Sequence, residues 1–312
     1  MTEKERVVFD KITKQAQFSD LYDENFQGLI CGVDSIYILK LVKDNGSTKT
    51  LFSRALKSNV DIESKILHRI IGDDNIEPYF VEENNEYIIF PYDDEGKLIS
   101  AEKLEIKYPL SWNYLKNFKQ ILKSREKNKF NNSQWYQFSR NQALDKQKLI
   151  KILIPHVVKR MRVAFDEHGE HFTKNVGVNS IVLKSEIKES PYYILALLNS
   201  SIASFYIAKT SIFLNGGFYA SNKQFASSLP VKRIDFKNSN DVQKHDNIVQ
   251  RVIELIKLKN AIVDVRVANE KEIIVRKANA LQKQIDNLVY ELYNLGDNDK
   301  EVILKALPTE ND

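Results

Sequence analysis

The stretch Ser190–Ile234 constrains the fold more than any other part of the chain. Its first half, Tyr192–Tyr206, carries apolar side chains on a helical period, which predicts one helix with a broad buried face. Gly216 and Gly217 then break any helix, and Leu229-Pro230 closes the stretch in an extended conformation. The pattern therefore predicts a core helix that leads into a polar loop hinged on two glycines.

The length and composition bound the class of protein. The chain has 312 residues, of which 43% are hydrophobic, enough for two packed units with a substantial core. Its apolar runs are interrupted well before the roughly 20 residues needed to span a bilayer, and the N-terminus lacks a signal-peptide core. We therefore expect a cytoplasmic protein without membrane contacts. The single cysteine, Cys31, and five scattered histidines indicate neither an internal disulfide nor a metal site.

Short strands and helices alternate through the first two thirds of the chain. The turn signal Asp44-Asn45-Gly46-Ser47 predicts a β-hairpin from Phe26–Val42 to Lys49–Phe52. Further elements are expected as strands at Glu86–Tyr92 and Ile150–Pro155, a hairpin at Ala164–Leu183, and helices at Val60–Ile71 and Leu110–Lys127.

The last quarter of the chain is helical in pattern. The polar tract Asp235–Asn240 lacks periodicity and marks a boundary. Asp241–Leu295 has two apolar faces that do not keep one heptad register, which favours two antiparallel helices over one coiled coil. The fold class is therefore α+β, a mixed sheet and hairpin domain followed by a helical pair. The expected bounds are 1–236 for the domain, 241–296 for the helical pair and 297–312 for a polar tail.

The charge distribution is uneven along the chain. Residues 72–106 carry eleven Asp and Glu against two Lys and Arg, whereas residues 111–162 carry thirteen Lys and Arg against two Asp and Glu. One interpretation is a pair of solvated faces with complementary charge. The other is that the basic segment faces phosphate groups.

Four groups of residues together resemble a known family. They are Phe26–Leu39 (FQGLICGVDSIYIL), Trp135-Tyr136-x-x-x-Arg140, the Leu198-Asn199-Ser200 helix with Gly216-Gly217-x-Tyr219 and Leu229-Pro230-Val231, and the closing helix Ile285–Leu295. Their order resembles that of the C-terminal specificity region of TaqI-like and Eco57I-like DNA adenine-N6 methyltransferases, of type II and type IIG. The resemblance extends over nearly the whole chain.

The catalytic motifs of such methyltransferases are not found in this sequence. There is no glycine-rich turn for S-adenosylmethionine, and Ser190-Pro191-Tyr192-Tyr193 lacks the Asn or Asp and the second proline of the loop that holds a flipped adenine. The acidic residues around Glu86 and Asp94 could suggest a nuclease metal site, but a solvated turn is the simpler interpretation. We therefore expect no catalytic residues and no cofactor in this chain, with S-adenosylmethionine bound by a catalytic domain or partner.

The resemblance implies sequence-specific binding of double-stranded DNA. The chain would be the target-recognition domain or subunit of a restriction-modification adenine-N6 methyltransferase, whose parent enzyme either has or lacks an endonuclease. Its expected partners are double-stranded DNA and a methyltransferase catalytic domain or subunit. The alternative is a protein-interaction module that assembles a phage-defence complex without direct base readout.

Two sets of side chains are candidates for contacts with DNA. Phosphate groups are bound by cations, and base edges are read by Arg or Lys at guanine and by Asn or Gln at adenine. The phosphate-binding candidates are Lys116, Lys119, Lys123, Lys129, Lys159, Arg160 and Arg162. The base-reading candidates are Asn132, Gln134, Arg140, Asn141, Asn215, Tyr219, Asn222 and Lys223.

Overall fold

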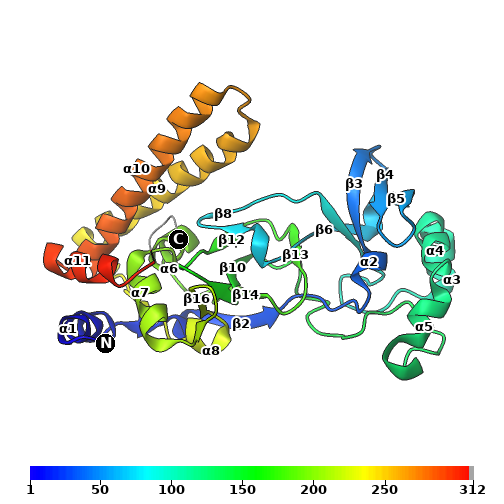
Figure 1. Ribbon diagram of the computed structural model, residues 1–312, viewed down its shortest axis with the longest axis horizontal. Helices are drawn as coiled ribbons and strands as arrows, with labels where there is room; N and C mark the ends of the chain where they lie inside the picture. Colours follow the sequence, from blue (N-terminus) through cyan, green and yellow to red (C-terminus); the bar gives the residue numbers. More distant parts are fainter. Residues whose placement is uncertain (309–312) are drawn as a thin grey trace.

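The chain folds into two lobes and a projecting helical arm. A computed structural model describes residues 1–308, with residues 263 and 264 described through their backbone alone. Figure 1 shows the six-stranded sheet and helices α2 to α5 at one end of the long axis, and the four-stranded sheet with the remaining helices at the other. We use "six-stranded lobe" for residues 30–72 and 83–148 with β13, and "helical lobe" for residues 1–27, 73–82 and 151–308 without β13. The predicted fold class, a mixed α and β domain with a C-terminal helical pair, is confirmed.

Within residues 1–308 the strands form five sheets. The sheet of the six-stranded lobe has the order β13 (His171–Thr173), β6 (Leu67–Ile71), β9 (Glu86–Ile89), β3 (Ile38–Asp44), β4 (Thr48–Ser53) and β5 (Ser58–Glu63). The sheet of the helical lobe has the order β12 (Ala164–Asp166), β10 (Lys151–Pro155), β14 (Val178–Leu183) and β2 (Tyr22–Gln27). The small sheets are β11 (Val157–Val158) with β16 (Phe218–Ala220) and β15 (Phe213–Leu214), β1 (Ala16–Gln17) with β17 (Pro230–Val231), and β7 (Ile76–Glu77) with β8 (Phe80–Val81).

The helices follow the same division between lobes. Those of the six-stranded lobe are α2 (Asp34–Tyr37), α3 (Ala101–Lys107), α4 (Pro109–Lys116) and α5 (Lys119–Asn128). Those of the helical lobe are α1 (Glu3–Ile12), α6 (Pro191–Leu198), α7 (Ser201–Thr210), α8 (Lys223–Ala226), α9 (Ser239–Asp264), α10 (Ala268–Leu292) and α11 (Asp297–Lys305).

The predicted core helix of residues 192–206 is two helices. Helices α6 and α7 meet at a bend of 55°. The second helix starts anew there, because Ser200 is the N-cap of α7 and accepts a hydrogen bond from the Ala203 amide at 3.2 Å. Most side chains of both helices are buried against β10 and β14, in one core with the bases of α9 and α10. Within residues 1–308, no single helix is long and apolar enough to cross a membrane. Of the helix pairs in this range, only the bent pair α6–α7 has that length and apolarity when its two helices are taken together.

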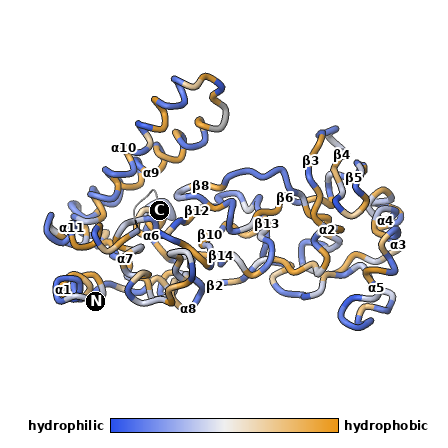
Figure 2. Tube along the Cα trace, in the orientation of Figure 1, coloured by the Kyte–Doolittle hydropathy of each residue, from blue (hydrophilic) through white to orange (hydrophobic). Residues whose placement is uncertain are grey.

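The two predicted C-terminal helices are confirmed as α9 and α10, which run side by side as the projecting arm (Figure 1). Hydrophilic and hydrophobic residues alternate along the coloured part of the arm (Figure 2), as expected of two amphipathic helices. Ile248, Ile285 and Val289 are fully buried at the base of the arm, in the core shared with residues 1–236. The proposed division of the chain into domains therefore stays a prediction.

Within the predicted polar tail, residues Asp297–Lys305 form α11, and Ile303 of this helix is fully buried. This apolar anchor was hidden among charged neighbours in the sequence. Residues 309–312 of the predicted tail lie outside the described residues.

The hairpin around Asn45-Gly46 is confirmed as β3–β4, with Lys40 opposite Phe52 and Asp44 opposite Lys49. Its first strand begins only at Ile38, because Phe26 and Gln27 belong to β2 of the other sheet and Asp34–Tyr37 form α2. The prediction of a helix over residues 60–71 is wrong, because this segment forms the end of β5 and all of β6. Its apolar residues fit a helical period, but Ile62 is buried in the pairing of β5 with β4, and Ile70 and Ile71 lie in a central strand. Strand pairing with distant segments decided the structure here.

The predicted hairpin over residues 164–183 is also wrong. Its three strands join different neighbours: β12 and β14 flank β10 in the helical lobe, whereas β13 runs parallel to β6 in the six-stranded lobe. The passage of β13 from one sheet to the other is one of the connections between the two lobes.

A glycine lies where the chain passes β13 on its way between the lobes. A Cβ atom at Gly28 would lie 2.4 Å from the carbonyl oxygen of Thr173 and 2.7 Å from that of Asn175. Leu29 is held to the same segment, since its amide donates to the Thr173 carbonyl at 2.7 Å. The glycine of the Gln27-Gly28 pair is therefore required by the close approach of two backbones.

Replacing Gly28 with alanine should lower the free energy of unfolding by about 3 kcal/mol, because the atoms in the way are backbone and cannot rotate aside. The matched control is Gly46→Ala in the β3–β4 turn, where φ is +83° but no atom lies within 4 Å. The free energy of unfolding of that variant should fall by only about 1 kcal/mol, because alanine is strained at this positive φ. Denaturant unfolding of both variants checks this, and equal losses would contradict the steric explanation.

A buried charge network lies at the junction of the lobes. The ammonium of Lys151, whose side chain is 0% exposed, donates to the Asp166 carboxylate at 2.6 Å and to the Gln147 carbonyl at 2.7 Å. The Asp166 carboxylate also lies 3.2 Å from Nδ1 of His171, and Nε2 of His171 lies 3.0 Å from the Glu83 carboxylate. The network thus links β10 and β12 of one sheet to β13 and the approach to β9 of the other.

His171 should make stability depend on pH. Burial disfavours its charged form, but hydrogen bonds to Asp166 and Glu83 outweigh this and raise its pKa from 6.5 to about 9. A raised pKa in the folded state stabilises the fold below pH 6.5, and the contribution of roughly 3 kcal/mol is lost as pH rises toward 9. Unfolding measured from pH 6 to 9.5 should show this decline. In His171→Gln the decline should disappear, and an unchanged decline would assign it to another group.

Candidate functional site

The candidate residues fall into two groups at opposite ends of the molecule (Figure 1). The first group, on the six-stranded lobe, comprises Lys116, Lys119, Lys123, Lys129, Asn132, Gln134, Arg140 and Asn141. The second group, on the helical lobe, comprises Lys159, Arg160, Arg162, Asn215, Tyr219, Asn222 and Lys223. The basic segment 111–162 is therefore not one continuous stripe, because the chain crosses from one lobe to the other between α5 and β10.

Carboxylates neutralise part of the first group. Arg140 pairs with Glu126 at 2.6 Å and donates to the Ser139 carbonyl at 2.7 Å, and Lys129 lies 3.7 Å from the same Glu126 carboxylate. The hydrogen bond from Arg140 lowers the pKa of Glu126. Lys116 lies 3.6 Å from Glu105. The remaining polar candidates of this group, Asn132, Gln134 and Asn141, are exposed.

The aromatic residues of this lobe are core residues. Trp135, Tyr136 and Phe138 are at most 4% exposed, and the ammonium of Lys119 lies 5.7 Å from the centre of the Trp135 ring. These rings are therefore buried against the lobe and not presented to a ligand.

Arg125 holds together several segments of the same lobe. In the sequence it was counted only as one of the basic residues of segment 111–162. Its buried guanidinium donates to the carbonyl oxygens of Leu122, Cys31, Trp135 and Gln137, each at 2.8 Å, and stacks 4.2 Å from the Phe130 ring. The backbone leaves helical geometry at this residue. The only sequence signal was its position at the end of a helical period.

The structure brings the second group together through strand pairing. β11 pairs with β16, so that Val157 lies opposite Ala220 and Val158 opposite Tyr219. The segment 159–162, which follows β11, therefore lies against the β15–β16 hairpin, and the ammonium of Lys159 is 5.4 Å from the Phe218 ring. Two segments separated by more than 50 residues in sequence form one surface.

The Leu198-Asn199-Ser200 motif holds this segment in place. The Asn199 side chain accepts a hydrogen bond from the Val163 amide at 2.8 Å and donates to the Val163 carbonyl at 2.9 Å. The Ser204 hydroxyl accepts from the Met161 amide at 3.0 Å. The bend between α6 and α7 is thus used to fix the conformation of the cationic segment.

Individual members of the second group have different roles. Arg162 donates to the carbonyl oxygens of Asp73 and Ile76 at 2.7 and 2.6 Å, which fixes its guanidinium against the fold. Asn222 is the N-cap of α8 and accepts from the Gln224 amide at 3.2 Å. Tyr219 is half-buried against the Phe213 ring, whereas Asn215 and Lys223 are exposed. Of the four base-reading candidates in this lobe, Asn215 and Lys223 are thus the best placed to reach a ligand.

Sequence reasoning also missed the tip of this surface. Ile212 and Phe213 are 58% and 64% exposed at the start of the β15–β16 hairpin. Gly216 and Gly217 turn the hairpin with φ of +79° at both positions. The two glycines predict a polar loop here, and an exposed aromatic side chain at its start was not foreseen from the sequence.

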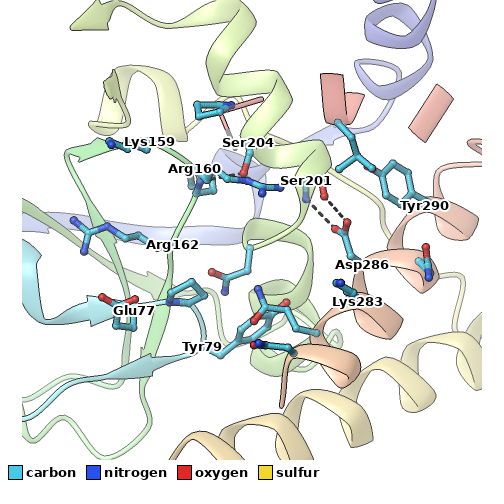
Figure 3. A pocket seen from close by; sticks show the side chains of 18 of the residues that line it. Glu77, Tyr79, Lys159, Arg160, Arg162, Ser201, Ser204, Lys283, Asp286 and Tyr290 are labelled. Atoms are coloured by element: carbon cyan, nitrogen blue, oxygen red, sulfur yellow. Dashed lines mark hydrogen bonds between the residues drawn. The ribbon is translucent and has the colours of Figure 1, made fainter. Parts of the chain in front are cut away.

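A cavity of about 740 Å³ opens beside the cationic segment. Figure 3 shows Lys159, Arg160 and Arg162 on one side of it, and Lys283, Asp286 and Tyr290 of α10 on the other. The Asp286 carboxylate accepts hydrogen bonds from the amide of Ser201, at 2.9 Å, and from its hydroxyl. Burial raises the pKa of Asp286, although Ser201 and the charges of Arg160 and Lys300 favour the ionised form.

The acidic residues considered as a nuclease site are engaged elsewhere. Glu83 pairs with Arg69 at 2.6 Å, Glu86 pairs with Lys174 at 3.0 Å, and Asp94 pairs with Lys148. Each of these three carboxylates faces a lysine or arginine, and Glu83 also faces His171, which is the pattern of structural ion pairs.

Comparison with known proteins gives one consistent family. The sequence profile of the TaqI-like C-terminal specificity domain matches residues 68–231. The chain is 25% identical over 241 residues to the type II restriction enzyme and methyltransferase RM.Eco57I of Escherichia coli, covering 74% of this chain and 24% of that protein. It is 21% identical over 286 residues to the type II methyltransferase M.BstVI of Geobacillus stearothermophilus, covering 90% of this chain and 40% of that protein. It is 27% identical over 158 residues to the type II methyltransferase M.HindII of Haemophilus influenzae, covering 49% and 30%. The chain thus spans well under half the length of these relatives.

Proposed function

Because this chain belongs to the family of TaqI-like C-terminal specificity domains, we propose that it recognises a specific sequence in double-stranded DNA. It does so as the target-recognition domain or subunit of a restriction-modification adenine-N6 methyltransferase. Methyl transfer takes place in a separate catalytic domain or subunit, which binds S-adenosylmethionine and receives the flipped target adenine. The contribution of this chain is to choose where on the duplex that reaction occurs.

The observation that carries this proposal is the pairing of β11 with β16. This pairing brings the segment 159–162 against the β15–β16 hairpin, with the Lys159 ammonium 5.4 Å from the Phe218 ring. Asn215 lies in the turn of this hairpin and Lys223 begins α8 just after it. We infer that cations suited to phosphates and side chains suited to base edges act on the same stretch of DNA. The helical lobe therefore forms the primary interface with DNA. The lysines of α4 and α5 and Lys129 after them, of which Lys116 pairs with Glu105 and Lys129 with Glu126, contribute at most outlying phosphate contacts.

A titration of the full chain with a fluorescent duplex of random sequence tests for DNA binding. We expect binding at 50 mM salt that weakens steeply by 200 mM, because each neutralised phosphate releases counterions. Absence of binding at low salt, with and without a methyltransferase partner, would refute the proposal and favour the protein-assembly function instead.

Replacing Lys223 with alanine should relax the preference at one base pair of the recognised site. A lysine that contacts a base edge contributes about 1–3 kcal/mol of discrimination against the wrong base. The matched control is Lys43→Ala on β3, which should leave the preference unchanged because it lies in the other lobe. Binding to duplexes substituted one base pair at a time measures the effect. A uniform loss over all duplexes would instead make Lys223 a phosphate contact.

A further inference from the structure

The cavity beside residues 159–162 has the size of a small-ligand site. It measures about 740 Å³, and such sites typically measure about 300–1,000 Å³. Its walls come from segments far apart in the sequence: the turn at residues 77–79, residues 159–162, the start of α7, and helices α10 and α11. The arm helix α10 thus forms one wall of the cavity as well as half of the arm.

The cavity concentrates positive charge. Among the described residues that line it, five side chains are cationic and two, Glu77 and Asp286, are carboxylates, and Lys300 also pairs with Asp297 at 3.5 Å. The cations are Lys159, Arg160, Arg162, Lys283 and Lys300. Because they come from three separate segments, the excess of charge is a property of the fold and not of one basic run. A concave surface with such an excess attracts anions.

One wall of the cavity offers groups for an uncharged polar ligand. The Tyr290 side chain is only 2% exposed, and its hydroxyl makes no hydrogen bond of normal geometry to any of the described residues, although the nearby Ser201 hydroxyl partly offsets the rise that burial causes in the pKa of Tyr290. A buried hydroxyl without a partner is costly, so a ligand atom that accepts its proton would be favoured. The neighbouring Asp286 carboxylate binds Ser201 but retains acceptor positions, since a carboxylate can accept about four hydrogen bonds.

We propose that this cavity binds a nucleotide whose base carries an amino group, such as adenine or cytosine. The phosphate lies against Arg160, Lys283 and Lys300, the amino group donates to Asp286, and the adjacent ring nitrogen accepts from Tyr290. The nucleotide is either part of a DNA strand, exposed by unpairing, or a free mononucleotide. Only the first source rests on the proposed function, because the second requires no DNA.

Calorimetric titration of the full chain with dAMP, dCMP, dTMP and inorganic phosphate tests the proposal. We expect dAMP and dCMP to bind at least tenfold more tightly than dTMP and phosphate, because thymine has no amino group for Asp286. Lys283→Gln should weaken binding of dAMP about tenfold. Tyr290→Phe should weaken dAMP several-fold and leave phosphate unchanged, and it removes only an unpaired hydroxyl, so folding should be retained. Lys277→Gln, an exposed lysine of α10 that does not line the cavity, is the control.

A single-stranded oligodeoxyadenylate distinguishes the two sources. If the nucleotide belongs to DNA, the oligonucleotide binds more tightly than dAMP and loses affinity in Lys283→Gln and Tyr290→Phe; if it is free, dAMP binds more tightly. The inference would be overturned if no ligand binds, or if neither substitution changes the affinity for any ligand. Duplex binding that persists in both variants without dAMP binding would overturn it while leaving the proposed function intact. Binding of dAMP without duplex binding would support the inference and overturn the proposed function.

Discussion

Replacing Asp166 with asparagine should lower the free energy of unfolding by about 3–5 kcal/mol, the usual cost of removing one partner from a buried ion pair. The Lys151 side chain is 0% exposed and the Asp166 side chain 2% exposed, so the remaining ammonium cannot be solvated by water. The substitution also removes the charge that His171 faces at 3.2 Å. Because this network joins the two sheets, its loss should destabilise both lobes, and they should no longer unfold in one cooperative transition.

Denaturant unfolding of three variants checks this expectation. Asp94→Asn is the matched control, because its pair with Lys148 is exposed at the surface and should contribute less than about 1 kcal/mol. Combining Asp166→Asn with Lys151→Met should recover part of the loss, since the uncompensated charge is then gone. A loss as small as that of Asp94→Asn would mean that water reaches Lys151 and that the junction is not held by this network.

Local sequence signals predicted the elements whose partners lie close in the chain. The β3–β4 hairpin follows from the turn at Asn45-Gly46, and the antiparallel pair α9 and α10 follows from two amphipathic periods separated by a short break. In both cases a neighbouring segment supplies the packing surface. The residues that make the turn or the apolar face are therefore enough to identify the element.

Elements stabilised by distant partners could not be predicted in this way. β6 resembled a helix because Ile66, Leu67, Ile70 and Ile71 fit a 3.6-residue period, and only its pairing with β9 and β13 makes it a strand. The same limit applies to the candidate site. Counting charges along residues 111–162 cannot reveal that the chain changes lobes within that segment, nor that β11 brings its last cations to the β15–β16 hairpin. The role of Arg125 was equally hidden, because its carbonyl partners come from three separate segments.

Neutralising Lys159 and Arg160 together, as Lys159→Gln with Arg160→Gln, should weaken duplex binding about a hundredfold at 0.1 M salt, independently of DNA sequence. Each lost phosphate contact removes about 0.9 from the slope of log affinity against log salt, so the slope should fall by about 1.8. Arg162 is left unchanged because it donates to the carbonyls of Asp73 and Ile76, and its loss would disturb the fold.

The matched comparison is Lys116→Gln with Lys119→Gln in the six-stranded lobe, which removes the same charge. That pair should weaken binding less than about threefold, because the primary interface lies on the other lobe. Salt titrations of both double variants measure affinity and slope together. The reverse order of effects would move the interface to α4 and α5.

The most direct test of sequence-specific recognition is selection of duplexes from a random pool by the full chain, followed by sequencing of the bound fraction. We expect one short motif to be enriched over successive rounds, and its enrichment at one position to fall in Lys223→Ala. A bound pool that matches the unbound pool in sequence, at salt concentrations where the chain binds DNA, would contradict the account.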